Sequence, residues 1–472
     1  MSRFWRFVLP LLVGGVIAVS PVPAGLTPNA WHYFALFVTV MGMIITEPMA
    51  PAALGLIGVG VAAALGLVRD TPAQSAQWAL SGFSNTTVWL IFGGYMFTLG
   101  YTVTGLGRRI ALHLVRLLGG RTLGLGYALA LADLALAPFT ASAAARSAGT
   151  VYPVVRHIPE LYDSRPDDGT ARRMGSYLLY TALASSFITS SMFVTALAPN
   201  VLALSIIQQT TGITVSWVEW FVGFAPVGFV LLALVPLLLY VIYPPEIKEA
   251  PAVPRWAADQ LRTMGPMSRN EWVLLVLVLG ALGMWVGAAH HVEPVVTAMI
   301  VVVLMVGLGV VSWEQMVGHS TAFNVLVWFA TLVTLAGGLA ETKFVDWLAR
   351  GLAPSFVGLG TYAAVIAVVG SFFVLHYFFA SITAHTTSLL PVFLSVAIAI
   401  PGPSQKQWAL FLAYSLGLTG VVTAYAAGQN VIYYGSGFIP RRDFWVLGAV
   451  LGVVYLAVYL AIIVPWLTYL GV

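Results

Sequence analysis

Two short polar segments interrupt long apolar stretches of this chain, and each carries residue types that suit anion binding. In the first, Ser142 is followed four positions later by Arg146, and in the second Ser381 is followed at the same spacing by His385. The two serines are 239 positions apart (381 − 142), and so are the two basic residues (385 − 146). Repetition at one offset indicates a duplicated unit, which is common in membrane transport proteins.

The chemistry expected at these segments is that of a helix end. A helix that begins inside a membrane exposes backbone N–H groups and the positive end of its dipole where no water pairs with them. Ser142 and Ser381 are typical N-cap residues, and the small Ala143, Ala144 and Thr383 behind them let the backbone approach a ligand closely. Two such ends facing each other would hold a molecule with a negative group at each end, which favours a dicarboxylate over a monocarboxylate.

The two basic side chains each allow more than one interpretation. An arginine near the middle of a membrane costs about 2.5–3.5 kcal/mol and needs a partner. Arg146 can bind a carboxylate with two parallel hydrogen bonds, pair with Asp133, or extend to a basic membrane face. His385 can contact the ligand or bond a backbone carbonyl as a neutral imidazole.

Three amides lie where long apolar segments are expected to unwind. Asn200, Gln429 and Asn430 are expected first to stabilise the unwound backbone and second to line the site. Ser142, Ser381 and Thr383 can act as caps alone or as caps that also touch ligand. The candidate substrate-binding residues are Ser142, Ala143, Ala144, Arg146, Asn200, Ser381, Ile382, Thr383, His385, Gln429 and Asn430.

The composition places the elements that carry these residues in lipid. The chain is 60% hydrophobic and 8% charged with a mean hydropathy of +0.92, whereas about 25% of a soluble protein is charged. Residues 71–107, 407–440 and 444–472 contain no Asp, Glu, Lys or Arg, and each run exceeds the ~20 residues that cross a bilayer as a helix. The lipid bilayer is therefore an expected partner.

The basic balance of the chain does not indicate nucleic acid. The 21 Lys and Arg residues are spread between apolar segments, so they are better interpreted as topology signals. The chain has no cysteine, which excludes disulfides, thiolate metal sites and thiol nucleophiles. No cofactor or metal site is expected.

We expect an all-α polytopic membrane protein with about 11 transmembrane segments, some of them unwound. The expected spans of the first half are 2–20, 31–46, 51–68, 82–105, 176–208 (interrupted at 198–200) and 217–243. Those of the second half are 272–287, 294–311, 323–340, 408–438 (interrupted at 427–430) and 444–469. Amphipathic interfacial helices are expected at 106–119 and 344–352.

Each polar break is expected at the tip of a re-entrant hairpin, at about 122–156 and 361–400. The arms of the first, 123–137 and 142–155, look too short to cross and both its flanks are basic, and the second half repeats this plan. Five expected spans lie between the hairpins, so the second hairpin enters from the opposite face and the repeat is inverted. With a cytoplasmic N-terminus, 16 of the 21 Lys and Arg residues lie on the cytoplasmic side, four lie outside and Arg146 lies in the hairpin. This bias agrees with the expected spans.

The organisation that follows has two repeats and one connection. Residues 1–245 hold the N-terminal spans and the first repeat, 246–271 form a charged cytoplasmic connection, and 272–472 form the second repeat.

At these residues the sequence resembles the divalent anion:sodium symporter family, above all its citrate/succinate, tartrate/succinate and 2-oxoglutarate/malate exchangers. The matching segments are 142–153 and 381–385 at the two hairpins and 196–200 and 432–439 at the unwound helices. The resemblance covers nearly the whole chain. It implies a homodimer in the bacterial inner membrane, with a scaffold and a mobile part that moves like an elevator.

The chain departs from that pattern at the positions that matter for sodium. Ala143 and Ala144 replace an asparagine and a threonine, and Ile382 replaces the asparagine that sodium-coupled members carry. Sodium ligation by those side chains is therefore missing, which makes a sodium cofactor doubtful. A vacant site with a fixed Arg146 would carry buried positive charge, so we expect the carrier to exchange one dianion for another.

Three alternatives remain open. The first is a sodium-coupled symporter of dicarboxylate or sulfate. A membrane-embedded enzyme is more remote, since the sequence has no HExxH motif, phosphate-binding loop or paired intramembrane aspartates. A channel would not need two broken hairpins.

Overall fold

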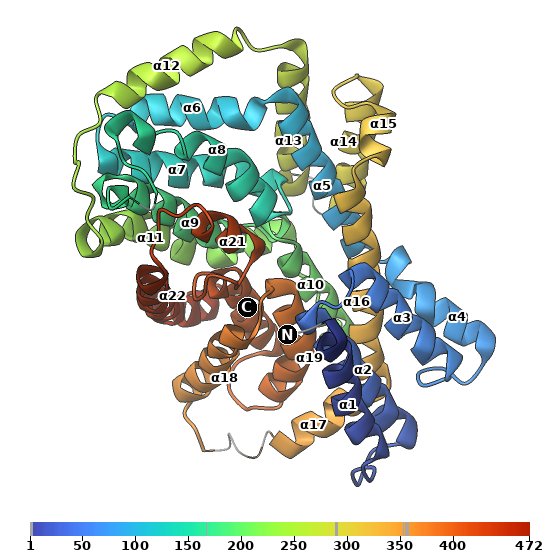
Figure 1. Ribbon diagram of the computed structural model, residues 1–472. Coiled ribbons are helices and arrows are strands. Elements are labelled where there is room, and N and C mark those ends of the chain that lie inside the picture. The colour runs from blue at the N-terminus through green and yellow to red at the C-terminus, as the bar shows by residue number, and fades with distance from the viewer. Residues whose placement is uncertain (1–2, 167, 288–290, 353, 355–357) are drawn as a thin grey trace.

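The computed structural model describes residues 3–166, 168–287, 291–352, 354 and 358–472, and every regular element in these ranges is a helix. Figure 1 shows the elements in chain order. Those of the first half are α1 (Arg3–Val19), α2 (Pro28–Thr46), α3 (Pro51–Ala64), α4 (Pro72–Leu80), α5 (Thr86–Thr104), α6 (Leu106–Leu118), α7 (Thr122–Leu136), α8 (Tyr152–Val155), α9 (Gly175–Met192), α10 (Ala198–Thr211) and α11 (Trp217–Ile242). After the connecting helix α12 (Ala252–Met264), the second half contains α13 (Arg269–Gly287), α14 (Pro294–Gly307), α15 (Trp313–Val317), α16 (Ser320–Glu341), α17 (Phe344–Leu352), α18 (Thr361–Leu375), α19 (Ile382–Ile398), α20 (Gln405–Thr419), α21 (Gly428–Tyr434) and α22 (Arg441–Tyr469).

Short turns of other helix types join these elements, some of them at the polar breaks. They are the 3₁₀ turns η1 (Ser81–Ser84), η2 (Ala137–Phe139), η4 (Pro159–Tyr162), η5 (Ala171–Arg173), η6 (Val194–Ala196) and η8 (His376–Phe378), and the π-helix η3 (Ala144–Val151).

The expected membrane class is confirmed. Within the described ranges, seven helices are long and apolar enough to cross a membrane: Pro28–Thr46, Thr122–Phe139, Trp217–Ile242, Arg269–Gly287, Ser320–Glu341, Thr361–Phe378 and Arg441–Tyr469. Four shorter apolar helices are Phe4–Val19, Pro51–Ala64, Pro294–Gly307 and Ile382–Ile398. The chain is therefore a multi-pass helical membrane protein.

The first arm of the first predicted hairpin is longer than expected, and that of the second has the expected length. A 3₁₀ turn extends α7 to Phe139 and α18 to Phe378, which makes each arm 18 residues long. At 1.5 Å per residue such an arm is about 27 Å long, close to the thickness of the hydrocarbon core. The expectation that the first arm of the first hairpin is too short to cross is therefore wrong, and the re-entrance of both hairpins stays a prediction.

The two halves repeat the same order of helices. The hairpin arms Thr122–Phe139 and Thr361–Phe378 begin and end 239 positions apart (361 − 122 and 378 − 139), the offset that the serines predict. The amphipathic helices α6 and α17 occupy the predicted segments 106–119 and 344–352 almost residue for residue. The inversion of the second half relative to the first stays a prediction.

The helix breaks lie earlier than expected. We predicted interruptions at 198–200 and 427–430, but α9 ends at Met192 and α20 at Thr419, so the predicted residues begin the next helices instead. Pro199 suits this place because proline has no N–H, and the first N–H groups of a helix lack intrahelical partners anyway.

The amphipathic helix α6 packs against α12 and is bonded to the start of α13. Figure 1 shows α6 and α12 running side by side. The guanidinium of Arg109, 6% exposed, donates to the carboxylate of Glu271 (Nε to Oε1, 2.6 Å) and to the carbonyl of Gly265 (2.9 Å). These bonds join α6, the helix that precedes the first hairpin, to the segment that connects the two halves.

Candidate functional site

The first polar break forms a capped helix start, as predicted. The hydroxyl of Ser142 accepts a hydrogen bond from the backbone N–H of Ala145 (3.2 Å), and the carbonyl of Ala141 accepts one from Ala198, the first residue of α10 (2.9 Å). Gly94 of α5 lies so close to this tip that an added Cβ would be 2.5 Å from that of Ala141. The tip is therefore held between α5 and α10.

Ala143 and Ala144 lead into a π-helix, so the second arm of the first hairpin does not begin as a regular α-helix. Ala143 is 3% exposed, and Ala144 is the first residue of the π-helix that ends at Val151. Gly428, which begins α21, approaches this segment, and a Cβ there would be 3.6 Å from that of Ala144. π-Helices are frequent at functional sites, and this one brings the first hairpin against the helix that carries Gln429 and Asn430.

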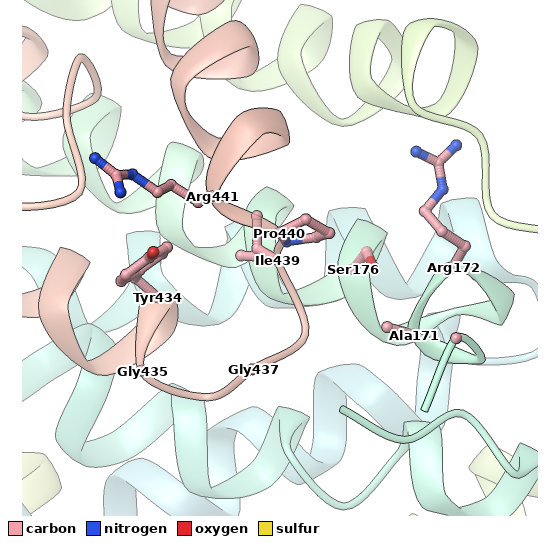
Figure 2. A pocket seen from close by; sticks show the side chains of 10 residues that line it. Ala171, Arg172, Ser176, Tyr434, Gly435, Gly437, Ile439, Pro440 and Arg441 are labelled. Carbon is pink, nitrogen blue, oxygen red and sulfur yellow. The ribbon is translucent and has the colours of Figure 1, made fainter. Parts of the chain in front are cut away.

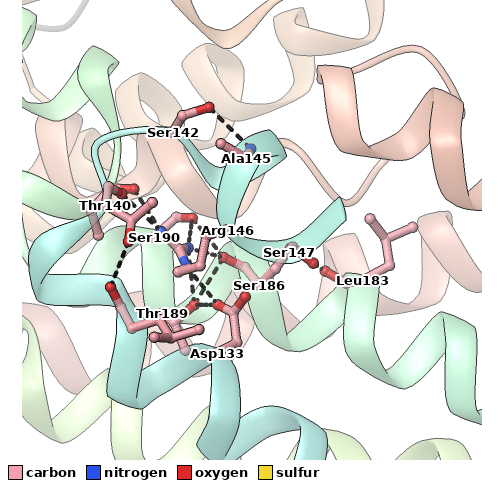
Figure 3. A network of polar contacts seen from close by, with 12 residues as sticks. Asp133, Thr140, Ser142, Ala145, Arg146, Ser147, Leu183, Ser186, Thr189 and Ser190 are labelled. Carbon is pink, nitrogen blue, oxygen red and sulfur yellow. Dashed lines mark hydrogen bonds and ion pairs between the residues drawn. The ribbon is translucent and has the colours of Figure 1, made fainter. Parts of the chain in front are cut away.

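Arg146 is fully enclosed by protein partners. It is 1% exposed, and its Nε donates to the carboxylate of Asp133 (3.0 Å), which is also 1% exposed. One terminal nitrogen donates to the carbonyls of Thr140 (3.2 Å) and Ala196 (2.9 Å). The other donates to the hydroxyl of Ser190 (2.8 Å) and lies within reach of Thr189 and Ser186. Figure 3 shows this network.

These contacts account for all five N–H donors of the guanidinium. Of the interpretations that the sequence leaves open for Arg146, the structure shows the pair with Asp133. The side chain joins α7, the first tip, the 3₁₀ turn η6 and α9, and it presents no free donor to a ligand in this conformation.

The second break has the same cap but different surroundings. The hydroxyl of Ser381 accepts from the N–H of Ala384 (3.4 Å), so this serine also caps its helix. Ile382 is 4% exposed and Thr383 is 7% exposed at the start of α19. No acidic residue lies in the first turn of α19.

His385 lies in a cluster of rings. It is fully buried, and its ring centroid is 4.4 Å from that of Phe372, 4.9 Å from that of His376 and 5.2 Å from that of Phe379. Within the described part of the chain neither ring nitrogen has a hydrogen-bond partner. The carbonyl bond that we considered for His385 is made instead by His376, whose Nε2 is 3.2 Å from the carbonyl of Ala426.

The two asparagines make the same pattern of bonds. The amide of Asn200 donates to the carbonyls ten and seven residues before it in the chain (2.7 and 3.1 Å), and Asn430 does the same (2.9 and 2.6 Å). Both therefore tie together an unwound segment, as predicted. Both side-chain oxygens, and the amide nitrogen of Gln429, are buried without a partner among the described residues.

The candidate residues are linked through the two short helices that follow the unwound segments. α10 begins at the first tip and packs against α19, which follows the second tip. α21 packs against the π-helix of the first hairpin, where the hydroxyls of Tyr433 and Ser147 are 3.0 Å apart. The segment before α21 reaches the second hairpin, since the hydroxyl of Tyr425 donates to the carbonyl of Tyr377 (2.9 Å).

Sequence reasoning missed the hydroxyl groups of α9. Every residue of this helix is buried, and Ser186, Thr189 and Ser190 all contact the guanidinium of Arg146. The signal was present as a run of serines and threonines at 185–191 inside an apolar segment. A buried arginine needs such acceptors, so this run could have been matched to Arg146.

Two cavities open elsewhere on the molecule, and no candidate residue lines either. The larger, of about 770 Å³, lies between the start of α5, α10, the start of α11 and the α13–α14 connection. It reaches Val194 in the unwound segment and includes Gln208 and Glu219. The other, of about 500 Å³, lies between the start of α9 and the start of α22 and is shown in Figure 2.

Comparisons with known proteins agree with this architecture. The family described as "Sodium:sulfate symporter transmembrane region" matches residues 1–472. The citrate/succinate antiporter of Escherichia coli (strain K12) is 45% identical over 474 residues, which cover 98% of this chain and 97% of the relative. The L-tartrate/succinate antiporter of the same strain is 41% identical over 478 residues, covering 99% and 98%.

Solved structures share the fold at much lower identity. The YdaH transporter of Alcanivorax borkumensis has a TM-score of 0.59 at 14% identity, over 99% of this chain and 98% of its own. MtrF of Neisseria gonorrhoeae, described among antimetabolite efflux pumps, has a TM-score of 0.56 at 13% identity, over 97% and 93%. The relatives are named as transporters and not as enzymes, and their match over the whole length shows that this chain belongs to the sodium:sulfate symporter family, within the divalent anion:sodium symporters that its motifs resemble.

Proposed function

We propose that this chain exchanges small dicarboxylate or tricarboxylate anions, of the succinate, malate, 2-oxoglutarate and citrate type, across the membrane. The observation that carries the proposal is the full-length identity of 45% and 41% to two proteins named as succinate antiporters. The two serine-capped helix starts supply a matching chemistry, because backbone N–H groups at a helix N-terminus bind carboxylates.

The substrate site that we propose lies at the two tips and the helices between them. Backbone donors at Ser142–Ala144 and at Ser381–Thr383 hold the carboxylates. His385, Gln429 and the side-chain oxygens of the two asparagines are buried polar groups without partners among the described residues, so they are free to pair with substrate. Arg146 orients the first tip and does not bind substrate directly.

We propose exchange rather than sodium symport. Ala143 and Ala144 carry no side-chain oxygen, and the carbonyls of Thr140 and Ala196 already accept from Arg146. A sodium ion that shared these carbonyls would lie beside the guanidinium, and repulsion between the two cations disfavours it there. The guanidinium of Arg146 bridges the tip and the unwound segment. Unlike a bound sodium ion, this cation is covalently attached and cannot dissociate.

The physical reason for exchange differs from the one expected from sequence. Asp133 balances the charge of Arg146, so an empty site does not carry that charge uncompensated. The cost of empty return lies instead in the unpaired polar groups, since closing over buried groups without partners costs about 1–3 kcal/mol each. Bound substrate supplies those partners in both directions of transport.

The wider mechanism that we propose is an elevator in a homodimer. The hairpins, α9, α10, α20 and α21 form the moving part, and the two halves are inverted repeats. The membrane is the bacterial inner membrane, with the N-terminus in the cytoplasm. The equal length of the two hairpin arms and the matched bonds of Asn200 and Asn430 support two equivalent halves.

Counterflow in proteoliposomes tests the proposal. Labelled succinate is expected to accumulate in vesicles loaded with succinate, to saturate, and to do so equally when sodium is replaced by choline. Vesicles without internal dicarboxylate are the control and are expected to show little uptake. Sustained uptake into such empty vesicles under a sodium gradient would refute exchange and establish the sodium-coupled alternative.

A further inference from the structure

The two tips share a hydrogen bond that the proposed substrate site does not include. The first arm of each hairpin ends in a 3₁₀ turn, Ala137–Phe139 in the first and His376–Phe378 in the second. The middle residues of these turns are Pro138 and Tyr377, which are 239 positions apart (377 − 138). Carbonyls at the end of a helix lack intrahelical partners, so the carbonyl of each middle residue needs a donor from elsewhere in the chain.

The donor comes from the same place in each unwound segment. In the first half the hydroxyl of Thr195 donates to the carbonyl of Pro138. In the second half the hydroxyl of Tyr425 donates to the carbonyl of Tyr377 (2.9 Å). Each donor lies five residues before the asparagine that ties its segment together (200 − 195 and 430 − 425), so the two donors occupy equivalent positions. The side chains differ, and the shared feature is the bond itself.

A tryptophan from the next long helix contacts each donor. At the start of α11 the Nε1–H of Trp217 donates to the hydroxyl of Thr195 (3.1 Å), and its ring stacks on that of Phe193 (centroids 5.6 Å apart). Near the start of α22 the ring of Trp445 lies edge-on to that of Tyr425 (centroids 6.0 Å apart). Both tryptophans restrict the rotation of the side chain that bonds the tip.

Packing alone does not fix either donor. The 770 Å³ cavity is lined by Trp217 and by Val194, the residue before Thr195, so space is left open on that side of the unwound segment. The second donor is more open still, because Tyr425 is 40% exposed. The hydrogen bonds to the tips are therefore needed to hold the two segments in place.

We propose that Thr195 and Tyr425 are positioning residues of the two tips. Each hydroxyl holds a carbonyl that lies four residues before the capping serine (142 − 138 and 381 − 377), and so determines where the N–H groups behind that serine point. This role rests on the proposed exchange function, because those N–H groups are the ones that hold the carboxylates. Neither side chain contacts substrate, and each acts through the tip that it bonds.

Deuterium uptake by the full chain in detergent, measured without substrate, tests the positioning. Thr195→Val removes the hydroxyl and keeps the shape of the side chain, so it is expected to speed deuterium uptake at the first tip, residues 140–146. Tyr425→Phe is expected to do the same at the second tip, residues 379–385. The loss of one hydrogen bond corresponds to about two- to twelvefold faster uptake. Thr195→Ser, which keeps the hydroxyl, is expected to behave like the wild type.

Succinate affinity is measured on the same variants by titration calorimetry. A tip that is correctly placed for only a fraction of the time lowers the apparent affinity by that fraction. Thr195→Val and Tyr425→Phe are therefore expected to bind succinate more weakly, by at most the factor seen in deuterium uptake. Tyr455→Phe is the matched control, because it removes a bond of the same 2.9 Å from a tyrosine to the carbonyl of Ala184 on α9. It is expected to lower the unfolding midpoint and to leave both tips unchanged.

The outcomes separate the positioning role from the exchange function. Unchanged deuterium uptake at the tips in Thr195→Val and Tyr425→Phe, or equally faster uptake in Tyr455→Phe, would overturn the positioning role. A change at only one tip would overturn the equivalence of the two donors. Faster uptake with the succinate affinity of the wild type would overturn their part in substrate binding. Failure of the wild type itself to bind succinate would count against the exchange function instead, because deuterium uptake is measured without substrate.

Discussion

The two hairpins are built on one plan, yet the basic residue of each tip has opposite surroundings. Arg146 lies among an acid, hydroxyls and carbonyls, whereas His385 lies among rings. The partners occupy equivalent positions, because Phe372 stands 239 residues after Asp133 (372 − 133) and Phe379 the same distance after Thr140 (379 − 140). The counter-charge of the first tip is thus replaced by a phenyl ring at the second, and within the described residues the imidazole of His385 stays unbonded among aromatic rings.

The difference indicates that Arg146 stabilises its tip, whereas His385 is available to a ligand. All donors of Arg146 are used within the protein, so the first basic residue determines the shape of its tip. The imidazole of His385 is positioned by packing alone and keeps both nitrogens unbonded within the described residues. We therefore expect substitutions in the network of Arg146 to act on folding and substitution of His385 to act on binding.

The largest effect is expected from Asp133→Ala. The substitution leaves the guanidinium of Arg146 buried without its counter-charge, which destabilises a protein by about 3–5 kcal/mol. The unfolding midpoint of the purified protein measures this. The double variant Asp133→Leu with Arg146→Met is expected to be more stable than Asp133→Ala, because no charge remains unpaired. If Asp133→Ala unfolds like the wild type, the ion pair does not hold the first tip.

His385→Phe is expected to affect binding rather than folding. A phenyl ring preserves the packing against Phe372 and Phe379, but it cannot hydrogen-bond a carboxylate. A bond to a charged group contributes about 1.5–3 kcal/mol, so succinate affinity is expected to fall by about ten- to 150-fold. Titration calorimetry with succinate measures this change.

The neighbouring histidine is the matched control for that experiment. His376→Phe removes the bond to the carbonyl of Ala426. It is expected to lower the unfolding midpoint and to leave succinate affinity nearly unchanged. A loss of succinate affinity in His376→Phe but not in His385→Phe would contradict the difference that we infer between the hairpins.

The smallest effect is expected where the hairpins are alike. Ser142→Ala and Ser381→Ala each remove one cap bond, which costs about 0.5–2 kcal/mol. The two variants are expected to lower the unfolding midpoint by similar amounts. Ser142→Thr and Ser381→Thr, which keep the hydroxyl, are expected to stay close to the wild type. A loss confined to one of the two alanine variants would show that only that serine acts as a cap.

Much of the fold could be predicted because its signals are local. Apolar run lengths place the spans, the amphipathic pattern places α6 and α17, and a cap bond joins Ser142 to a residue three positions away. The length of the first hairpin arm was underestimated, because Pro138 marks a break in the sequence although the 3₁₀ turn Ala137–Phe139 continues the arm. The positions of the breaks were misplaced because proline and glycine mark a helix start as readily as an interruption.

The amino-acid sequence by itself determined that this chain folds in lipid, that its helices occur in two matching sets and that a serine caps each broken tip, because periodicity and capping act over a few residues. Only the tertiary structure decided what Arg146 does. Its partners on α9 and in the turn after it are 40 to 50 positions away in the chain. Which buried acceptors meet a given donor depends on how helices pack, and spacing along the chain does not specify that packing.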